Sequence, residues 1–432
     1  MHWQGVSSLL NCLILFGRYP EPGRVKTRLI PYLGPAGAAQ LQKSLTEKTI
    51  HTARAVSYLA DVYFFYKGGS KKQLKRWLGR DIFYIRQSGQ HLGERMKNAF
   101  LSAQSKGYKK AVLIGTDIPD INPNHIERAF HELERKGLVI GPSDDGGYWL
   151  IGMHLERPLL DIFDGVEWGT EKVLFQTVDI IKREKRAFQL IDTLADIDTI
   201  QDIEKTGLKI PTPYISVIIP TLNEERYIRR AIRSVKCKDA EIIVVDGGSR
   251  DRTKEIAELE GAQVLESDKG RAIQQNTGAK IAKGEVLLFL HADTVLPEGY
   301  VNDIFATFME SGCFVGAFRF KTDMKTLFMR IIEFVANLRA RYLGLPYGDQ
   351  AIFMKKEFFR KIGGFPLISI AEDLYLMYRI SKMGKVKIIS KNALTSSRKW
   401  QKYGIINITY FHWKIFLSFF FERTKKESTI RR

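Results

Sequence analysis

The chain has 432 residues, of which 44% are hydrophobic and 27% charged, and its formal net charge is +19. This length exceeds what one ordinary hydrophobic core covers, so we expect two domains of roughly 200 residues each. The charge favours anionic partners, namely nucleotides, nucleic acid or an anionic membrane surface, without choosing among them.

The cysteines and the N-terminal segment narrow the cellular setting. Cys12, Cys237 and Cys313 are far apart and form no CxxC pair, which argues against a zinc site or a disulfide framework. Residues 9–16 are apolar but lack a basic flank and a small-residue cleavage site, so we predict a first strand and not a signal peptide. No uncharged apolar run of 18 residues is present. We therefore expect a cytoplasmic protein.

Short apolar runs alternate with amphipathic segments along the chain. This alternation indicates βαβ units and predicts an α/β fold with mostly parallel sheets flanked by helices. The predicted strands are residues 12–16, 61–66, 82–85, 110–115, 138–141, 215–219, 241–245, 263–266 and 285–290. In such sheets ligands bind at the carboxyl ends of the strands, so residues that follow strands are the candidate site residues.

The first predicted strand is followed by a glycine-rich basic loop, GRYPEPGRVKTRL. Its candidate phosphate contacts are Gly17, Arg18, Gly23, Lys26 and Arg28. Glycine lets the backbone approach a phosphate, and the cations balance the phosphate charge. The loop is not a Walker A motif, because Gly-Lys-Ser/Thr is absent at the proper spacing. A basic surface loop remains the alternative.

Acidic residues later in the first half follow strands. AVLIGTDIPDI ends a strand on Asp117, GPSDDGGYWLIG places Asp145 before two glycines, and FDGVEWGTEKVL and LADIDTIQDI come next. Together these segments resemble a GT-A-like transferase family related to the guanylyltransferases that make the nucleotide-linked precursor of a cofactor. The resemblance covers about residues 11–205. It implies a nucleotidyltransferase-like domain in which Lys26 and Arg28 meet phosphates, while Asp117 and Asp145 hold Mg²⁺ or Mn²⁺.

A proline pair marks the expected domain boundary. In GLKIPTPY, Pro211 and Pro213 fit neither a helix interior nor a central strand. We therefore place one domain at residues 1–210 and the other at residues 211–432.

The second domain opens with a strand and a predicted helix. Thr221 and Glu224 have the spacing of a capping box, which predicts that a helix starts there. The apolar positions along that segment follow helical spacing, and they are Tyr227, Ile228, Ala231, Ile232 and Val235.

Three acidic positions in the second half follow strands or begin a helix. Asp246 ends the run EIIVVD, Asp293 lies in LLFLHADT, and Glu372 and Asp373 begin a predicted helix. Each alone is compatible with a cap or turn residue. Strand-end carboxylates that meet in one cleft can also hold a divalent cation, which can neutralise a leaving diphosphate.

These motifs resemble the inverting family-2 glycosyltransferases of GT-A fold over most of residues 214–400. The matching segments are 220–224, 245–251, 290–293 and 371–373. The resemblance implies that Asp293 carries the metal and that Asp373, beside Glu372, is the catalytic base. It assigns the nucleotide and its diphosphate to Pro220, Leu222, Glu224, Asp246, Gly247 and Arg271. Leu222 departs from the tyrosine often found at that position, which leaves the base undefined.

Two further positions extend this interpretation. His291 stands where the family usually has an aspartate, and it is either a Mn²⁺ ligand, a phosphate-orienting group or a packing residue. YGDQAIF resembles an acceptor-side segment, which implies that Asp349 and Gln350 face the acceptor. The acceptor is expected to be a small molecule or a lipid.

The C-terminal segment is basic and aromatic. Residues 398–432 hold nine Lys or Arg against two Glu, with seven Phe, Tyr or Trp between residues 410 and 421. This composition is compatible with a peripheral helix on the inner face of an anionic membrane. It is equally compatible with a C-terminal helix that packs on the core and ends in a solvated basic tail.

The two resemblances together indicate a fusion of the kind associated with radical-SAM proteins or arsenosugar biosynthesis. The predicted activity is inverting, metal-assisted transfer of a sugar from a nucleotide donor, with a first domain that makes or binds that donor. A nucleotidyltransferase whose second half is auxiliary is the alternative. A nucleic-acid-binding protein is disfavoured, because no nucleic-acid motif is present and the basic residues form no single stripe.

Overall fold

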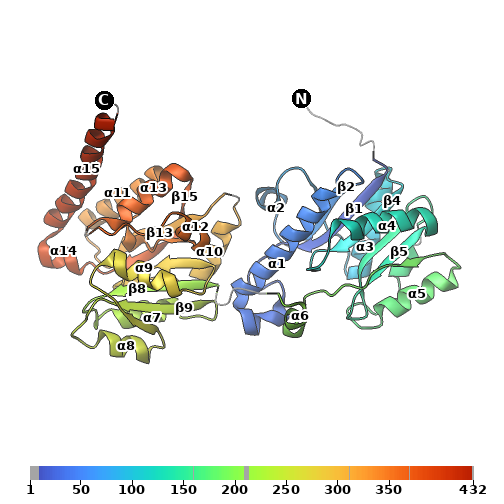
Figure 1. The fold of residues 1–432 in the computed structure, drawn as a ribbon, viewed down its shortest axis with the longest axis horizontal. Coiled ribbons are helices and arrows are strands. Elements are labelled where there is room, and N and C mark those ends of the chain that lie inside the picture. The colour runs from blue at the N-terminus through green and yellow to red at the C-terminus, as the bar shows by residue number, and fades with distance from the viewer. Residues whose placement is uncertain (1–8, 159, 209–213, 311, 369, 431–432) are drawn as a thin grey trace. The chain divides into compact units, whose positions relative to one another are not determined.

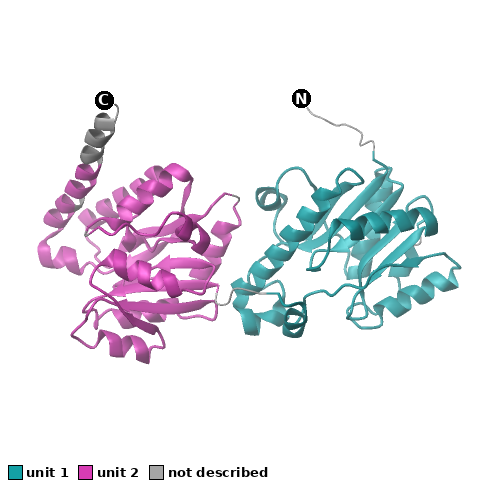
Figure 2. Ribbon diagram, in the orientation of Figure 1, with its two compact units in different colours: residues 1–210 teal, residues 211–432 magenta. Residues whose placement is uncertain are grey.

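The computed structural model describes residues 9–158, 160–208, 214–310, 312–368 and 370–430. It divides into two compact units, residues 1–210 and 211–432, which Figure 2 colours separately. Pro211 and Pro213 lie outside the described residues. Each unit is an α/β domain with helices packed against a sheet, which confirms the predicted fold class (Figure 1).

The first unit contains a seven-stranded sheet of order β3-β2-β1-β4-β6-β5-β7. Strand β6 runs antiparallel to β4 and β5, and the other neighbouring strands run parallel. The strands are β1 (Asn11–Arg18), β2 (Asp61–Lys67), β3 (Phe83–Arg86), β4 (Lys110–Gly115), β5 (Leu138–Pro142), β6 (Tyr148–His154) and β7 (Gln189–Leu190). The helices are η1 (Thr27–Leu29), α1 (Ile30–Ala55), α2 (Lys71–Leu78), α3 (Leu92–Ser105), α4 (Pro123–Lys136), η2 (Leu160–Phe163), α5 (Val173–Arg183) and α6 (Ile200–Thr206).

The second unit contains an eight-stranded sheet of order β10-β9-β8-β11-β14-β13-β15-β12. Strand β14 runs antiparallel to β11 and β13, and β12 runs antiparallel to β15. The strands are β8 (Ile215–Thr221), β9 (Ala240–Asp246), β10 (Gln263–Glu266), β11 (Val286–Phe289), β12 (Thr294–Val295), β13 (Val315–Thr322), β14 (Phe353–Lys355) and β15 (Val386–Thr395). The helices are α7 (Ile228–Val235), α8 (Thr253–Leu259), α9 (Arg271–Ile281), α10 (Tyr300–Phe308), α11 (Leu327–Leu343), η3 (Gly348–Gln350), α12 (Lys356–Lys361), α13 (Glu372–Met383), α14 (Arg398–Tyr403) and α15 (Ile405–Ile430).

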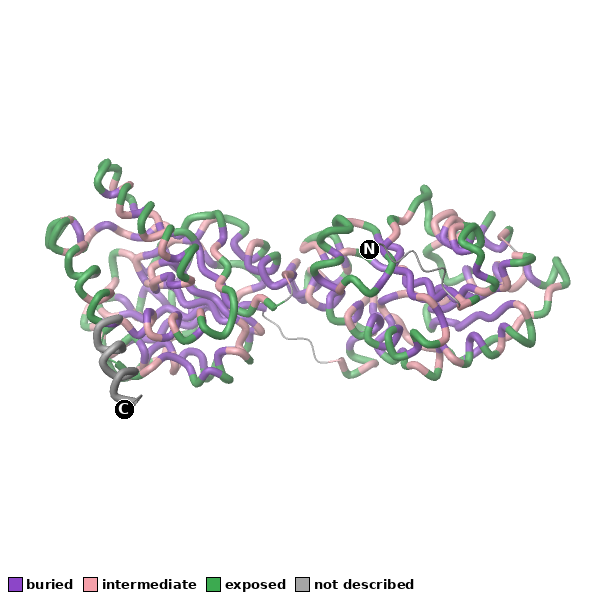
Figure 3. Tube along the Cα trace, turned by 90° about the horizontal axis from the view of Figure 1, so that it is seen from above, coloured by how far each residue is buried: buried purple, intermediate pink, exposed green. Residues whose placement is uncertain are grey.

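Continuous burial explains why the central strands were readable from sequence. Every residue of β8 is buried, and residues 12–15 of β1 are buried as well. Such strands lie between parallel neighbours and under helices, so both of their faces are apolar. Figure 3 shows the buried residues concentrated along the strands of each unit. All nine predicted strands are confirmed, with ends that differ by no more than two residues.

The predicted capping box at Thr221 is wrong. Thr221 is the last residue of β8, and α7 begins only at Ile228, without a side-chain cap. The hydroxyl of Thr221 instead donates to the Val245 carbonyl (3.4 Å) and the Asp246 carboxylate (3.2 Å), which ties β8 to β9. The helix predicted from the apolar spacing is confirmed. Four of its five apolar positions are buried, namely Ile228, Ala231, Ile232 and Val235.

The C-terminal helix α15 packs on its unit along part of its length. The ring centroid of Phe419 lies 4.5 Å from that of Tyr375 and 5.1 Å from that of Tyr378, both on α13. Tyr410 and Trp413 on the same helix are exposed. Basic residues 423–432 carry no described side chains. In the described part of the chain, no helix is long and apolar enough to cross a membrane.

Gln274 of α9 clamps the ends of two central strands. Its buried side-chain Nε2 donates to the carbonyls of Thr221 and Val245, at 2.8 Å each. We expect Gln274→Ala to destabilise this region by about 1–3 kcal/mol, because buried polar groups lose their partner. Hydrogen exchange of β8 and β9 measures this, and exchange should accelerate there and not in the first unit. The exposed Lys280→Ala on the same helix is the control, and equal exchange in both variants would contradict the clamp.

Candidate functional sites

The second unit has a cavity of about 420 Å³ where several elements end. It lies beyond β11, at the start of α9, at η3, at the start of α13 and after β15. Its charged and ionisable lining residues are Arg271, His291, Asp293, Tyr347, Asp349, Glu372, Asp373 and Lys399. The cavity therefore collects most of the carboxylates that the sequence singled out in this unit.

Asp293 is held by a guanidinium. Its side chain is only 8% exposed, and its Oδ2 lies 3.0 Å from a terminal nitrogen of Arg398, at the start of α14. The same nitrogen lies 2.5 Å from Oε1 of Glu224. The guanidinium carbon stands 4.5 Å from the ring centroid of Tyr227, in cation–π contact. Glu224, expected at the donor, therefore pairs with Arg398 in this structure.

Backbone donors orient the carboxylate of Asp373. The amide of Gly348 donates to its Oδ2 (2.6 Å), and the amide of Leu374 donates to its Oδ1 (2.7 Å). A Cβ atom at position 348 would lie 2.6 Å from Nε2 of His291 and 3.3 Å from Oδ2 of Asp373. A side chain at this position would meet both groups, so glycine lets the loop at η3 lie against His291 and Asp373.

Burial and neighbouring charges shift the pKa values of ionisable side chains that line this cavity. Burial raises the pKa of Asp349 to about 6, and the charges of Asp373 and Asp293 add to the effect against the opposing Arg339. Burial also raises the pKa of Glu372. For His291, burial and neighbouring cations lower the pKa well below its ordinary value, so the imidazole is neutral at pH 7. Crowded, poorly solvated carboxylates of this kind are stabilised by added positive charge.

The expected base-binding residues lie outside the lining of this cavity. Asp246 is fully buried, and its carboxylate accepts hydrogen bonds from the amides of Gly248 and Ser249 and from the hydroxyls of Ser249 and Thr221. Pro220 is buried in β8, whereas Leu222 and Gly247 are partly exposed beside it. Asp246 shapes the loop after β9, and a base contact from its carboxylate stays a prediction.

The two expected acceptor-side residues differ in their surroundings. Asp349 lines the cavity. Gln350 has no exposed surface, its Nε2 donates to the Phe318 carbonyl (3.0 Å), and its Oε1 accepts from the Tyr347 amide (3.2 Å). Gln350 therefore supports the loop that carries Asp349.

The first unit has a cavity of about 470 Å³ at the carboxyl ends of β1 and β4. Four of the five loop candidates line it, namely Gly17, Arg18, Lys26 and Arg28. Gly23 is not among the lining residues. A Cβ atom at position 17 would lie 2.6 Å from the Phe64 ring, so packing alone requires a glycine there.

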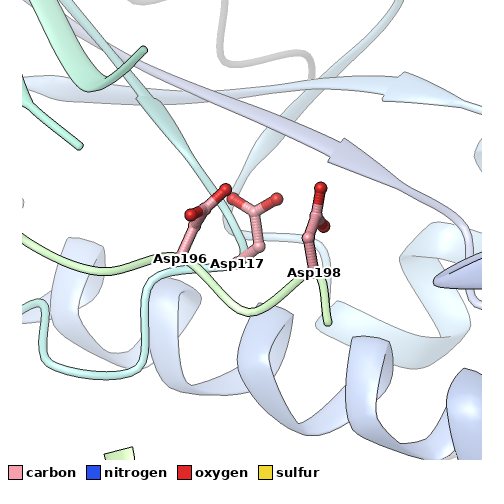
Figure 4. Close-up of side chains that lie close together, drawn as sticks. All are labelled: Asp117, Asp196 and Asp198. Atoms are coloured by element: carbon pink, nitrogen blue, oxygen red, sulfur yellow. The ribbon is translucent and has the colours of Figure 1, made fainter. Parts of the chain in front are cut away.

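Three aspartates meet at this cavity (Figure 4). Asp117 follows β4, and Asp196 and Asp198 come from the segment before α6. Each offers a carboxylate oxygen within 4.8 Å of the others, and this is the one such group of three acidic, His or Cys side chains in the described part of the chain. Hard carboxylate oxygens in this number suit Mg²⁺ or Mn²⁺.

A buried lysine neutralises these aspartates. Nζ of Lys26 lies 2.9 Å from Asp198 and 3.4 Å from Asp117, and its side chain is 4% exposed. Although burial opposes it, those two carboxylates raise the pKa of Lys26. Burial, with Asp117 and other carboxylates nearby, raises the pKa of Asp196 to about 7. Lys26 also has a left-handed backbone (φ 45°), a conformation that is costly for a non-glycine residue.

Sequence reasoning named Asp117 but missed Asp196 and Asp198. Their Asp-x-Asp spacing in LADIDT was the available signal, since alternate residues of an extended segment face the same way. Asp145 lines the cavity but lies outside the three-carboxylate group. Its Oδ1 accepts from the Ser143 hydroxyl (2.6 Å) and the Gly147 amide (2.9 Å). Its role as a metal ligand stays a prediction.

The fold and the strand-end carboxylates define two GT-A-like domains. Residues 49–170 match the family described as "Uncharacterized protein conserved in bacteria (DUF2064)", and residues 216–374 match "Glycosyl transferase family 2". Two successive parts of the chain therefore match two different families, which confirms that the chain is a fusion of two domains. The association with radical-SAM proteins or arsenosugar biosynthesis stays a prediction.

Each of the similar proteins matches only part of this chain. A PGL/p-HBAD biosynthesis glycosyltransferase of Mycobacterium bovis is 38% identical over 96 residues, which are 20% of this chain and 38% of that protein. Glycosyltransferase AglE of Haloferax volcanii is 36% identical over 93 residues, which are 19% of this chain and 31% of that protein. A solved "putative nucleotide-diphospho-sugar transferase" of Desulfovibrio desulfuricans G20 is 34% identical, with 46% of this chain and 86% of that chain covered and a TM-score of 0.44. The chain thus spans about a third of the length of these two curated relatives.

The aspartates of the first unit should bind a divalent cation. In an Asp293→Ala background, which removes the carboxylate expected to bind in the second unit, we expect Asp196→Asn to weaken Mn²⁺ binding by more than about tenfold, since loss of a mere outer-shell partner already costs that much. Electron paramagnetic resonance of free Mn²⁺ measures the affinity. The exposed Asp120→Asn is the control. Unchanged affinity in Asp196→Asn would contradict a metal site here.

Proposed function

We propose that the second unit transfers a sugar from a nucleoside diphosphate to an acceptor hydroxyl with inversion at the anomeric carbon. The observation that carries the proposal is the joint lining of one cavity by Asp293, Asp373 and Arg271. A carboxylate that can take a proton, a carboxylate that can hold a cation and a guanidinium at a helix start are the groups that such a displacement needs.

Each residue has a distinct role in the proposed displacement. The carboxylate of Asp373 accepts the proton of the acceptor hydroxyl as its oxygen attacks the anomeric carbon. Arg271, at the first turn of α9, and Lys399 balance the charge of the departing diphosphate. Asp293 would hold a divalent cation, Mg²⁺ or Mn²⁺, and such a cation supplies further charge neutralisation at the leaving diphosphate. Asp293 belongs to no compact three-ligand group among the described residues, so oxygens of the diphosphate and water would complete the coordination of the cation.

Glu372 and His291 have supporting roles in this proposal. Glu372 is almost fully buried, and its Oε1 lies 3.5 Å from Arg271, so it orients that guanidinium towards the cavity. His291, as a neutral imidazole beside Gly348, limits the space next to Asp373 and is available to orient a phosphate or a cation.

Asp373→Asn tests the assignment of the base. The amide keeps the shape and cannot accept the proton, so turnover should fall by about 10²–10⁴-fold with little change in donor binding. Transfer from a panel of nucleotide sugars in the presence of Mn²⁺, together with titration of the same donors, measures the two effects separately. Asp323→Asn, which alters a carboxylate outside this cavity, is the control. Turnover near that of the wild type in Asp373→Asn would remove Asp373 from this role.

For the first unit, we propose binding of a nucleotide or sugar phosphate, with formation of the activated donor as its reaction. The specific observation is the association of three carboxylates with Lys26, Arg18 and Arg28 around one cavity. Carboxylates that hold a divalent cation and cations that meet phosphates are the groups that nucleotidyl transfer needs.

Pyrophosphate release tests this second proposal. The full chain carrying Asp373→Asn, incubated with nucleoside triphosphates and sugar 1-phosphates, should release pyrophosphate with at least one pair. The reaction should fall by about 10²-fold or more in Asp117→Asn, since the cation that neutralises the phosphates would be lost. Absence of pyrophosphate with every pair would restrict the first unit to binding.

A further inference from the structure

An apolar groove of about 710 Å³ lies between α11 and the α14–α15 segment of the second unit. Its lining is almost entirely aliphatic and aromatic. Residues that form its walls include Phe328, Ile331, Val335, Trp400, Trp413 and Phe416.

The groove is continuous with the candidate active site. Tyr347, Asp349 and Trp400 line both the groove and the cavity that contains Asp373. A molecule that occupies the groove therefore has one end beside the carboxylate that we propose as the base.

Helix α11 presents its apolar side to this groove and to solvent. Its buried residues are Met329, Glu333 and Ala340, of which one is charged. By contrast, Ile331 is 53% exposed and Phe334 is 64% exposed. Contiguous exposed apolar side chains of this size mark a surface that binds something apolar.

The charge around the groove is positive. Arg339 and Asp349 are the charged residues that line the groove. Arg341 also lies on α11, and Lys399, Lys402 and Lys414 lie on α14 and α15, whereas Arg330 and Arg398 are already paired with carboxylates. Glu333 is the one acidic residue on α11, and it is paired with Arg330 at 2.5 Å. The guanidinium of Arg339 stacks 3.4 Å from the ring centroid of Tyr347, where the groove meets the active site. An apolar chain with an anionic head group is complementary to this arrangement.

We propose that the acceptor is an anionic lipid whose hydrocarbon chain lies in the groove between α11 and α15. Its head group passes Tyr347 and Trp400 and places a hydroxyl at Asp373. This inference rests on the proposed glycosyl transfer. In that reaction the hydroxyl oxygen bonds to the anomeric carbon, the bond from that carbon to the diphosphate breaks, and the hydroxyl proton goes to Asp373.

The test uses the full chain and dodecyl phosphate that carries a photoactivatable diazirine near the end of its chain, below its critical micelle concentration. Mass spectrometry should map the cross-links to α11 and α15. Unlabelled dodecyl phosphate should displace the probe, whereas inorganic phosphate at the same concentration should not. Displacement by inorganic phosphate alone would reduce the site to a phosphate site and overturn the proposal.

Two variants of α11 give a matched comparison. Ile331 lines the groove, whereas Phe334 is exposed on the same helix and is not among the lining residues. Ile331→Asp should lower labelling by about tenfold, because it removes apolar contact and places a charge in the groove. Phe334→Asp should leave labelling unchanged. Equal labelling in the two variants, or a dimer in solution that only Ile331→Asp dissociates, would overturn the lipid assignment.

Donor binding separates this inference from the proposed function. Calorimetric titration of UDP and GDP with Mn²⁺ is done in an Asp117→Asn background, which removes a proposed cation ligand of the first unit. In that background Ile331→Asp and Phe334→Asp should leave the affinity unchanged. Retained donor binding without groove labelling would overturn the lipid acceptor alone. Groove labelling without any nucleotide binding would overturn the glycosyl transfer, and the acceptor role with it.

Discussion

A charged side chain that is buried at the end of a strand has to be matched by an opposite charge or by several hydrogen bonds, because removing an ion from water costs several kcal/mol. The second unit meets this constraint with Arg398, which lies 3.0 Å from Asp293. In the first unit the buried ion is Lys26, whose side chain is 4% exposed, and Asp117 and Asp198 supply the opposite charge. In both units the chain itself supplies a cation at the place where a divalent cation and a phosphate are proposed to bind.

This constraint links distant parts of the second unit to its cavity. Arg398 reaches Asp293 after β11, Glu224 after β8 and the ring of Tyr227, so one guanidinium joins α14 to two strand ends. The position of α14 in turn places Trp400 between the cavity and the apolar groove. The same C-terminal segment that balances the buried charge also forms one wall of the proposed acceptor site.

Sequence reasoning recovered nine strands and most of the strand-end carboxylates, since apolar runs that end on a polar residue leave a local pattern. It missed β6, β7 and β12 to β15, of which β7, β12 and β14 have no more than three residues. Strand β15 has only three buried residues among ten, and it pairs mainly with β13 and the two-residue β12. It also missed Lys26 as the partner of Asp198, because the two are 172 residues apart and only the fold brings them together. The requirement for glycine at position 348 is a similar case. A Cβ atom there would meet His291, which is distant in the chain.

At Thr221 a local pattern predicted a helix cap that the structure does not have. Thr221 has the spacing of a helix cap, yet its hydroxyl serves the neighbouring strand. The helix with the proposed base begins at Glu372 after a left-handed Ala371, without a side-chain cap. At Thr221 tertiary contacts outweigh the local preference, as is common where a chain turns into a site.

We propose that Asp293 and a diphosphate together hold the catalytic cation. Anomalous scattering from Mn²⁺, in crystals of the full chain with and without UDP or GDP, locates that cation. We expect a peak beside Asp293 in the second unit only when the nucleotide is present, with Arg398 moved off the carboxylate. A cation on His291 without a nucleotide, or a bound nucleotide with no cation near Asp293, would contradict it.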